Sequence, residues 1–173
     1  MLMWARIDTM LGSGELVSTE QGLCYFAIYN GMDDVRNWIS VYFPDAEGLS
    51  LVPCHSYFTM ATKQLNEYLD GKRQRFTLPL DLKGTQFQKA VWEELLKVPY
   101  GQTISYGNLA IKSGYLGAAR AVGSAMRVNP LPIFVPCHRV LRANGSIGNY
   151  GGGMDLKRRL LQLEGVAMGR NDT

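Results

Sequence analysis

The sequence has few of the residues that build metal sites and disulfide frameworks. Its 173 residues include three cysteines, Cys24, Cys54 and Cys137, and two histidines. An odd number of widely spaced cysteines argues against a disulfide framework and fits a reducing compartment. Two histidines leave too few ligands for a zinc site of the common kinds. We therefore expect neither a metal centre nor a disulfide.

Long apolar runs are also missing. No stretch approaches the ~20 apolar residues that a membrane-spanning helix needs, and residues 1–6 lack the basic start and apolar stretch of a secretory signal. Hydrophobic residues make up 46% of the chain and charged residues 19%, which is ordinary for a globular protein. These features predict a cytoplasmic protein with no membrane partner, folded as one domain or as two small ones that share a core.

Positive charge is concentrated in the second half. The net charge is +3, but from residue 83 onward 12 lysines and arginines stand against 5 acidic residues. A basic half beside a neutral-to-acidic one is typical of proteins that bind polyanions. Scattered surface lysines and arginines explain the charge equally well, so other features must decide.

A cysteine, a histidine and an arginine follow one another behind a proline at residues 136–139. Only the thiolate form of cysteine is a strong nucleophile, and His138 and Arg139 could supply a base and a positive field to Cys137. For an isolated pair of this kind, a small apolar cysteine buried on a strand is the better explanation. Residues 52–55 carry a second Val-Pro-Cys-His run, so the pair alone is not diagnostic.

The context of the two copies differs. Cys54 precedes an amphipathic helix, whereas Cys137 precedes a glycine-punctuated loop at 144–153 and a late acid, Glu164. Such a loop lets bare backbone approach a flat ligand, because glycine lacks the side chain that would block it. A carboxylate that holds one imidazole nitrogen makes the other a better base, as in catalytic triads. The second copy is therefore the candidate nucleophile.

The N-terminal half predicts a small antiparallel meander followed by helices. Short β-branched or aromatic segments are separated by the turn signals Gly12–Gly14 and Thr19–Gly22. The predicted elements are strands at 4–9, 15–18 and 23–28, helices at 33–42, capped by Asp33 or Asp34, and at 58–69, and a last strand and linker at 76–82.

The C-terminal half predicts four helices, two of which form a helix-turn-helix. Their ranges are 85–98 with Thr85 as N-cap, 105–111 with Ser105 as N-cap, 118–128 after a turn at Gly114, and 155–164. The helix at 118–128 is slim, because small residues dominate it. It could approach a nucleic acid backbone closely or pack tightly inside the protein. Arg120 lies in its first turn, where a cation opposes the helix dipole, so a functional role explains it better.

Several motifs in register carry a family resemblance. AARAVGSAMR at 118–127, NP at 129–130, PCHRV at 136–140 and GNYGG at 148–152 resemble, in order and spacing, the motifs of the O6-alkylguanine-DNA alkyltransferases. The resemblance covers roughly residues 84–166, and the N-terminal half shares only length and general pattern. It implies an α/β fold: a small α/β domain at 1–80, with a ribonuclease H-like sheet and helices, and a mainly α, winged-helix-like domain with a helix-turn-helix at 84–173.

The resemblance also implies an activity. Members of this family repair DNA by direct damage reversal, moving the alkyl group of O6-alkylguanine irreversibly onto their own cysteine in a single turnover. O4-alkylthymine is a further candidate substrate. The implied partner is double-stranded DNA, bound through the minor groove by a monomer. No cofactor is implied, because the lesion is the alkyl donor.

Roles of individual residues follow from the same resemblance. Cys137 accepts the alkyl group, in a relay with His138 and Glu164 that includes a water between sulfur and imidazole. Asn129 supports the backbone turn around the cysteine, and Tyr106 hydrogen-bonds the flipped base and stabilises the leaving group. Packing between helices would explain Tyr106 equally well.

The implied DNA-binding residues lie on the slim helix. Arg120 enters the base stack through the minor groove and fills the space left by the flipped nucleotide, since O6 of guanine is reached in line only outside the stack. The same implied surface includes Ala119, Ala121, Gly123 and Tyr106, and the implied walls of the guanine pocket are Val140, Tyr150 and Gly151. Gly151 stands where some relatives carry serine, so only a backbone contact is expected there.

Three other functions use parts of the same sequence. A regulatory helix-turn-helix protein would need no reactive sulfur. An alkyltransferase-like protein binds lesions without repairing them and lacks the acceptor cysteine, which this chain has. A cysteine hydrolase would share the relay but would require an oxyanion hole and a route for water.

Overall fold

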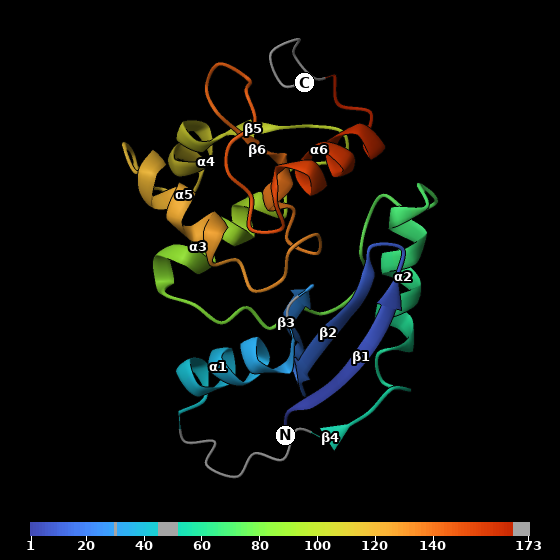
Figure 1. Cartoon of the computed structure of the whole chain (residues 1–173). Coiled ribbons are helices and arrows are strands. Elements are labelled where there is room, and N and C mark those ends of the chain that lie inside the picture. Colours follow the sequence, from blue (N-terminus) through green and yellow to red (C-terminus); the bar gives the residue numbers. More distant parts are fainter. Residues whose placement is uncertain (30, 45–51, 168–173) are drawn as a thin grey trace. The chain divides into compact units, whose positions relative to one another are not determined.

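The computed structural model describes residues 1–29, 31–44 and 52–167 and divides at Gly84 into two compact units (Figure 1). Unit 1 is Met1–Gly84 and unit 2 is Thr85–Thr173. Residues 168–173 of the predicted C-terminal domain lie outside the described residues. None of the helices in the described part of the chain is long and apolar enough to cross a membrane.

Unit 1 is built on a four-stranded sheet. Strands β1 (Met3–Thr9), β2 (Gly12–Thr19) and β3 (Gly22–Ile28) form the predicted antiparallel meander, and β4 (Val52–Pro53) pairs parallel to β1, giving the order β3-β2-β1-β4. The prediction that Gly12–Gly14 separates two strands is wrong, because these residues begin β2. Gly14 instead allows close packing: a Cβ there would lie 2.8 Å from the Phe26 ring.

Two helices complete unit 1. Helix α1 (Met32–Tyr42) contacts β2 and β3, and helix α2 (Thr59–Leu69) contacts β1. The N-cap of α1 is Gly31 rather than Asp33 or Asp34. Both aspartates lie in the first turn of the helix, where their negative charges interact favourably with the positive end of the helix dipole.

The predicted strand at 76–82 is wrong. These residues, all of which the structure describes, form no regular strand and meet the sheet at one bridge between Leu23 and Leu80. Leu23 donates its N–H to the carbonyl of Pro79, and Asp81 donates to the carbonyl of Leu23. Pro79 has no N–H of its own, so a longer ladder would lack a donor in its middle.

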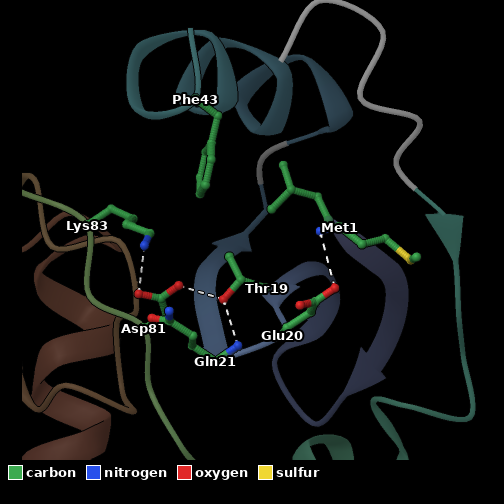
Figure 2. Close-up of a pocket in the computed structure, with 8 residues that line it drawn as sticks. Met1, Thr19, Glu20, Gln21, Phe43, Asp81 and Lys83 are labelled. Carbon is green, nitrogen blue, oxygen red and sulfur yellow. Dashed lines mark hydrogen bonds and ion pairs between the residues drawn. The ribbon is translucent and has the colours of Figure 1, made fainter. Parts of the chain in front are cut away.

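A pocket of about 270 Å³ belongs to unit 1 (Figure 2). Asp81 accepts a hydrogen bond from Thr19 at 2.5 Å and pairs with Lys83 at 2.8 Å, while Glu20 pairs with the N-terminal ammonium at 3.6 Å. These polar groups satisfy one another, so we assign no chemistry to this pocket. Its lining consists of Met1, Leu2, Thr19, Glu20, Gln21, Phe43, Asp81 and Lys83.

Unit 2 is mainly helical. Its elements are α3 (Gln86–Leu95), β5 (Ile104–Ser105), α4 (Tyr106–Lys112), α5 (Ala119–Arg127), the 3₁₀ turn η1 (Cys137–Arg139), β6 (Val140–Leu141) and α6 (Met154–Leu163). Thr85 caps α3 with a capping box and Ser105 caps α4, as predicted. Helix α3 ends three residues before the predicted Val98.

Helices α4 and α5 pack against each other on both sides of the turn at 113–118, where Gly114 has φ +86°. Strands β5 and β6 pair in parallel beside them. The buried Trp92 of α3 donates to the carbonyl of Ala125 at 3.1 Å and so fixes α5 to α3. These contacts hold the helix-turn-helix on the same core that carries η1.

Candidate active site

Cys137 begins the turn η1 and is 4% exposed. The cysteine is buried, as the apolar interpretation requires, but it lies on a turn with polar partners rather than on a strand. Asn129 donates from Nδ2 to Sγ of Cys137 and to the carbonyl of Val135, both at 3.0 Å, and its Oδ1 accepts the N–H of Leu131 at 3.0 Å. One side chain therefore closes the loop that leads to the sulfur.

Backbone strain accompanies this loop. Ile133 is buried and has φ +75°, a conformation that a β-branched residue rarely adopts and that costs of order 1–3 kcal/mol. The packing of the loop and the hydrogen bonds of Asn129 offset that cost. The cysteine is thus held by an arrangement that the surrounding structure must enforce.

Opposing effects act on the thiol of Cys137. Burial raises its pKa, and hydrogen bonds from Asn129 and Tyr150 together with the positive charge of Lys157 lower it. The sequence predicted Arg139 as the source of positive field, and this is corrected: Lys157 supplies it, and the guanidinium of Arg139 is directed at Glu164.

Lys157 is a buried lysine that the sequence analysis missed. It donates from Nζ to the carbonyl of Val140 at 2.6 Å, and burial lowers its pKa to about 8. Its position on α6 was the available signal, because it precedes Leu161 by four residues and Glu164 by seven. Residues at these spacings share one helix face, and Glu164 had already been predicted to join the relay with Cys137 and His138.

A Lys157→Met variant should react more slowly at Cys137. Without the ammonium the pKa of the thiol rises, and each unit of increase reduces the thiolate fraction tenfold at neutral pH. We expect about a tenfold loss of rate with an uncharged thiol reagent at pH 7, recovered at higher pH. Arg159→Met, which removes an exposed cation from the same helix, should leave the rate–pH curve unchanged. Equal curves for both variants would contradict the role of Lys157.

His138, Glu164 and Arg139 form a buried cluster. Nε2 of His138 lies 2.7 Å from Oε1 of Glu164, and Arg139 donates to the same carboxylate from Nε at 2.9 Å and from Nη2 at 2.9 Å. Gly101 adds its N–H at 3.1 Å. Burial lowers the pKa of His138, against a hydrogen bond and charge from Glu164 that raise it. The predicted pairing of His138 with Glu164 is thus present in the structure.

Tyr106 lies beside the sulfur and the glycine loop. Burial raises its pKa, and the charge of Cys137 raises it further, so the phenol keeps its proton and remains a donor. Gly148 leaves the space that the ring occupies, because a Cβ there would clash with the Tyr106 hydroxyl. Gly123 of α5 faces the same ring, and a Cβ there would lie 3.9 Å from it.

The other predicted residues occupy the surroundings. Val140 is buried directly after η1, Tyr150 is half-buried, and Gly151 is exposed with open space around it. On α5, Ala121 is exposed and Ala119 is half-buried. Arg120 is exposed and forms no ion pair within the ranges that the structure describes.

Family models cover both units. The model of the 6-O-methylguanine DNA methyltransferase ribonuclease-like domain matches residues 2–82, and that of the DNA binding domain matches residues 86–166. The chain belongs to the 6-O-methylguanine DNA methyltransferase family. Its mixed α/β fold, with a small sheet domain followed by a helical domain, confirms the predicted fold class. The likeness in the N-terminal half is closer than its sequence pattern alone indicated.

Individual members of this methyltransferase family support the assignment. The inducible methylated-DNA–protein-cysteine methyltransferase of Bacillus subtilis is 40% identical over 172 residues, which is 99% of this chain and 94% of the relative. The Mycobacterium bovis methylated-DNA–protein-cysteine methyltransferase is 53% identical over 107 residues, and the match spans 62% of this chain and 65% of the relative's length.

Solved structures of the family agree with this fold. The Mycobacterium tuberculosis O6-methylguanine methyltransferase has a TM-score of 0.79 at 39% identity, with 95% of this chain and 93% of that chain covered. The O6-methylguanine-DNA methyltransferase from Pyrococcus kodakaraensis has a TM-score of 0.70 at 30% identity, with 96% of this chain and 100% of that chain covered. The methyltransferase fold therefore extends over both units.

Proposed function

We propose that this protein repairs alkylated DNA by moving the alkyl group from O6 of guanine onto the sulfur of Cys137. The observation that carries the proposal is the buried thiol itself. Asn129 holds its sulfur, burial raises its pKa while the hydrogen bond from Asn129 and the charge of Lys157 oppose that rise, and the next residue is a histidine bonded to a buried carboxylate. Relatives named methylated-DNA–protein-cysteine methyltransferase support the same reaction.

In the proposed reaction, His138 takes the thiol proton through a water, and the thiolate attacks the alkyl carbon in line. The S–C bond forms as the C–O bond breaks, and the electron pair of that bond stays on the guanine oxygen. The proton that left the thiol returns to the guanine, so the products are a thioether and unmodified guanine. Tyr106, still protonated, donates a hydrogen bond to the ring and stabilises the charge that develops on it.

The proposed base pocket uses backbone groups next to the sulfur. Val140 and Gly151 offer backbone contacts to a flat base, and Tyr150 forms a wall. The open space around Gly151 fits a contact through its N–H alone. Because the carbonyl of Val140 accepts from Lys157, a base amino group would use the second lone pair of the same oxygen.

The proposed DNA surface is α5 with the start of α4. A Mycobacterium tuberculosis relative has been solved in complex with DNA, which supports DNA as the partner here. Ala119, Ala121 and Gly123 keep the helix slim, and Arg120 is an exposed cation without an ion pair among the described residues. We propose that the helix binds the minor groove of a duplex as a monomer and that Arg120 fills the stack when the alkylated base flips out.

In the proposal, the two units have different roles. Residues 84–173 carry the helix-turn-helix and every proposed site residue, and residues 1–80 support them. The proposed substrates are O6-alkylguanine and, as a further test, O4-alkylthymine.

The reaction should stop after one transfer per molecule. A thioether is not hydrolysed by the base and water of such a site, so limiting protein mixed with excess methylated duplex should give a burst of one methyl per protein, located on the Cys137 peptide by mass spectrometry. The added group crowds a packed site, and the thioether sulfur is a weaker acceptor for Asn129 than a thiolate, so the product should be less stable by about 1–3 kcal/mol. Continued release of methanol would instead support a hydrolase.

Arg120→Ala should slow repair of duplex DNA far more than reaction with free O6-methylguanine. Flipping a base out of a duplex costs a few kcal/mol, whereas a free base pays no such cost. We expect a loss of at least tenfold on the duplex and less than twofold on the free base, measured by single-turnover kinetics. Arg159→Met serves as a control for a lost surface cation. Equal losses on both substrates would assign the defect to folding or to the pocket.

A further inference from the structure

Arg139 and His138 share one carboxylate. Oε1 of Glu164 lies 2.7 Å from Nε2 of His138 and 2.9 Å from Nη2 of Arg139, and Oε2 accepts from Nε of Arg139 at 2.9 Å. The side chains of His138 and Glu164 are fully buried and that of Arg139 is 9% exposed. The carboxylate that orients the imidazole is thus already paired with a full positive charge.

This sharing changes what the carboxylate does to the imidazole. A lone carboxylate beside a histidine stabilises the imidazolium, so the histidine holds its proton to higher pH. A guanidinium on the same carboxylate cancels much of that attraction and repels a second proton on the ring. Screening by water is weak at a buried site, so the cancellation is strong. The carboxylate can then orient the ring without charging it.

We propose that Arg139 is a positioning residue that, by holding Glu164, keeps the His138 imidazole neutral near pH 7 and able to accept the proton of Cys137. This proposal rests on the proposed function for its role in alkyl transfer. Its electrostatic part concerns the histidine alone and can be measured without DNA. A neutral base is required, because an imidazolium cannot take the thiol proton.

The groups facing His138 come from two elements. Glu164 and Lys157 belong to α6 and its end, and Arg139 belongs to η1. Burial is the largest cause that lowers the pKa of His138, the hydrogen bond and charge of Glu164 raise it, and the charges of Arg139 and Lys157 lower it. Of the two cations, Lys157 bonds to a backbone carbonyl, so Arg139 is the one bound to the carboxylate itself.

Arg139 also makes contacts that would give it a purely structural role. It donates from Nη1 to the carbonyl of Val98 at 2.6 Å, and its guanidinium lies 6.0 Å from the centre of the Tyr100 ring. These contacts anchor η1 to the end of α3. Either role predicts that replacing Arg139 lowers stability. Only the electrostatic role predicts that the titration of His138 moves.

The chain offers a direct measurement, because it has only two histidines. His55 is exposed in unit 1, and a His55→Asn variant assigns the two imidazole signals in an NMR titration of the full chain. Arg139→Gln removes the charge and keeps an N–H donor. Arg139→Lys keeps the charge but loses the pair of N–H donors, Nε and Nη2, that bind the two carboxylate oxygens. Arg73→Met, which breaks the 2.8 Å pair of Arg73 with Glu67 in unit 1, is the matched control.

In Arg139→Gln, the pH midpoint of the His138 imidazole titration should rise by about one pH unit or more. A larger share of the imidazole is then protonated at pH 7, so the acid limb of the alkyl-transfer rate should move to higher pH by the same amount. Arg139→Lys should shift both by less than half as much, and Arg73→Met should shift neither.

Two outcomes would overturn the proposal, and a third would overturn only the proposed function. A His138 midpoint that stays fixed in folded Arg139→Gln leaves only the structural role. A wild-type His138 titration midpoint above pH 7 rejects it without any variant, so failure of Arg139→Gln to fold does not protect it. If Cys137 takes up no alkyl group while the midpoint shifts as expected, the proposed function fails and the electrostatic role of Arg139 stands.

Discussion

A Cys137→Ala variant should accept no methyl group from O6-methylguanine DNA, a loss beyond the detection limit of a mass-spectrometric assay. The proposed reaction consumes the sulfur, so no neighbouring group can replace it. Folding and DNA binding should survive, because the helix-turn-helix is held by other contacts, such as that between Trp92 and Ala125. Retained binding to methylated duplex without transfer would be the characteristic result.

Cys54→Ala is the matched control for this experiment, because it removes the cysteine from the second Pro-Cys-His run. Cys54 is half-buried, and its nearest polar partner is the hydroxyl of Ser56 at 3.9 Å. Transfer should stay nearly intact in this variant. The third cysteine is inert on physical grounds, since burial and then the charge of Asp81 raise the pKa of Cys24 to about 12. If transfer is lost in Cys54→Ala but not in Cys137→Ala, the acceptor is Cys54 rather than Cys137.

Glu164→Ala should destabilise the protein by about 3–5 kcal/mol, because it leaves the buried guanidinium of Arg139 without its partner. It also frees His138 from the group that orients its ring, so transfer should fall with stability. Chemical denaturation followed by circular dichroism measures the first effect, and single-turnover kinetics measure the second.

Glu67→Ala provides the comparison for that variant, since Glu67 pairs with Arg73 at 2.8 Å in a partly exposed setting. Exposed pairs contribute about 0–1 kcal/mol, so the two variants should differ several-fold in their cost. Similar losses of stability in both would show that the His138, Glu164 and Arg139 cluster is no stronger than a surface pair.

Much of the fold follows from local signals that the chain carries within a few residues. Thr85 and Ser105 cap their helices as predicted because capping needs only the side chain and the next turn. The helix-turn-helix could be predicted for the same reason, because Gly114 marks its turn. The strand predicted at 76–82 failed because strand pairing depends on a partner elsewhere in the chain, and Pro79 breaks the ladder that its pattern suggested.

The site divides in the same way. The motifs indicated Cys137, His138, Glu164 and Asn129, and the structure brings the sulfur to Asn129 and the imidazole to Glu164. Sequence order misled on the cations. Arg139 lies only two residues after the cysteine but bonds to Glu164, whereas Lys157 lies 20 residues after the cysteine and supplies the positive field. Nearness in sequence does not determine the direction of a side chain on a turn.

The wide spacing of Glu164 from its partners has a consequence for how the protein is made. Gly101 lies 63 residues before it, and His138 and Arg139 lie 26 and 25 residues before it. Contacts between distant residues form late, because the intervening chain must first be ordered. During synthesis on the ribosome, Cys137 emerges before the helix that completes its surroundings. Under the proposed single transfer, the sulfur that the reaction would consume is therefore activated last, after the helix-turn-helix that would bind DNA has emerged.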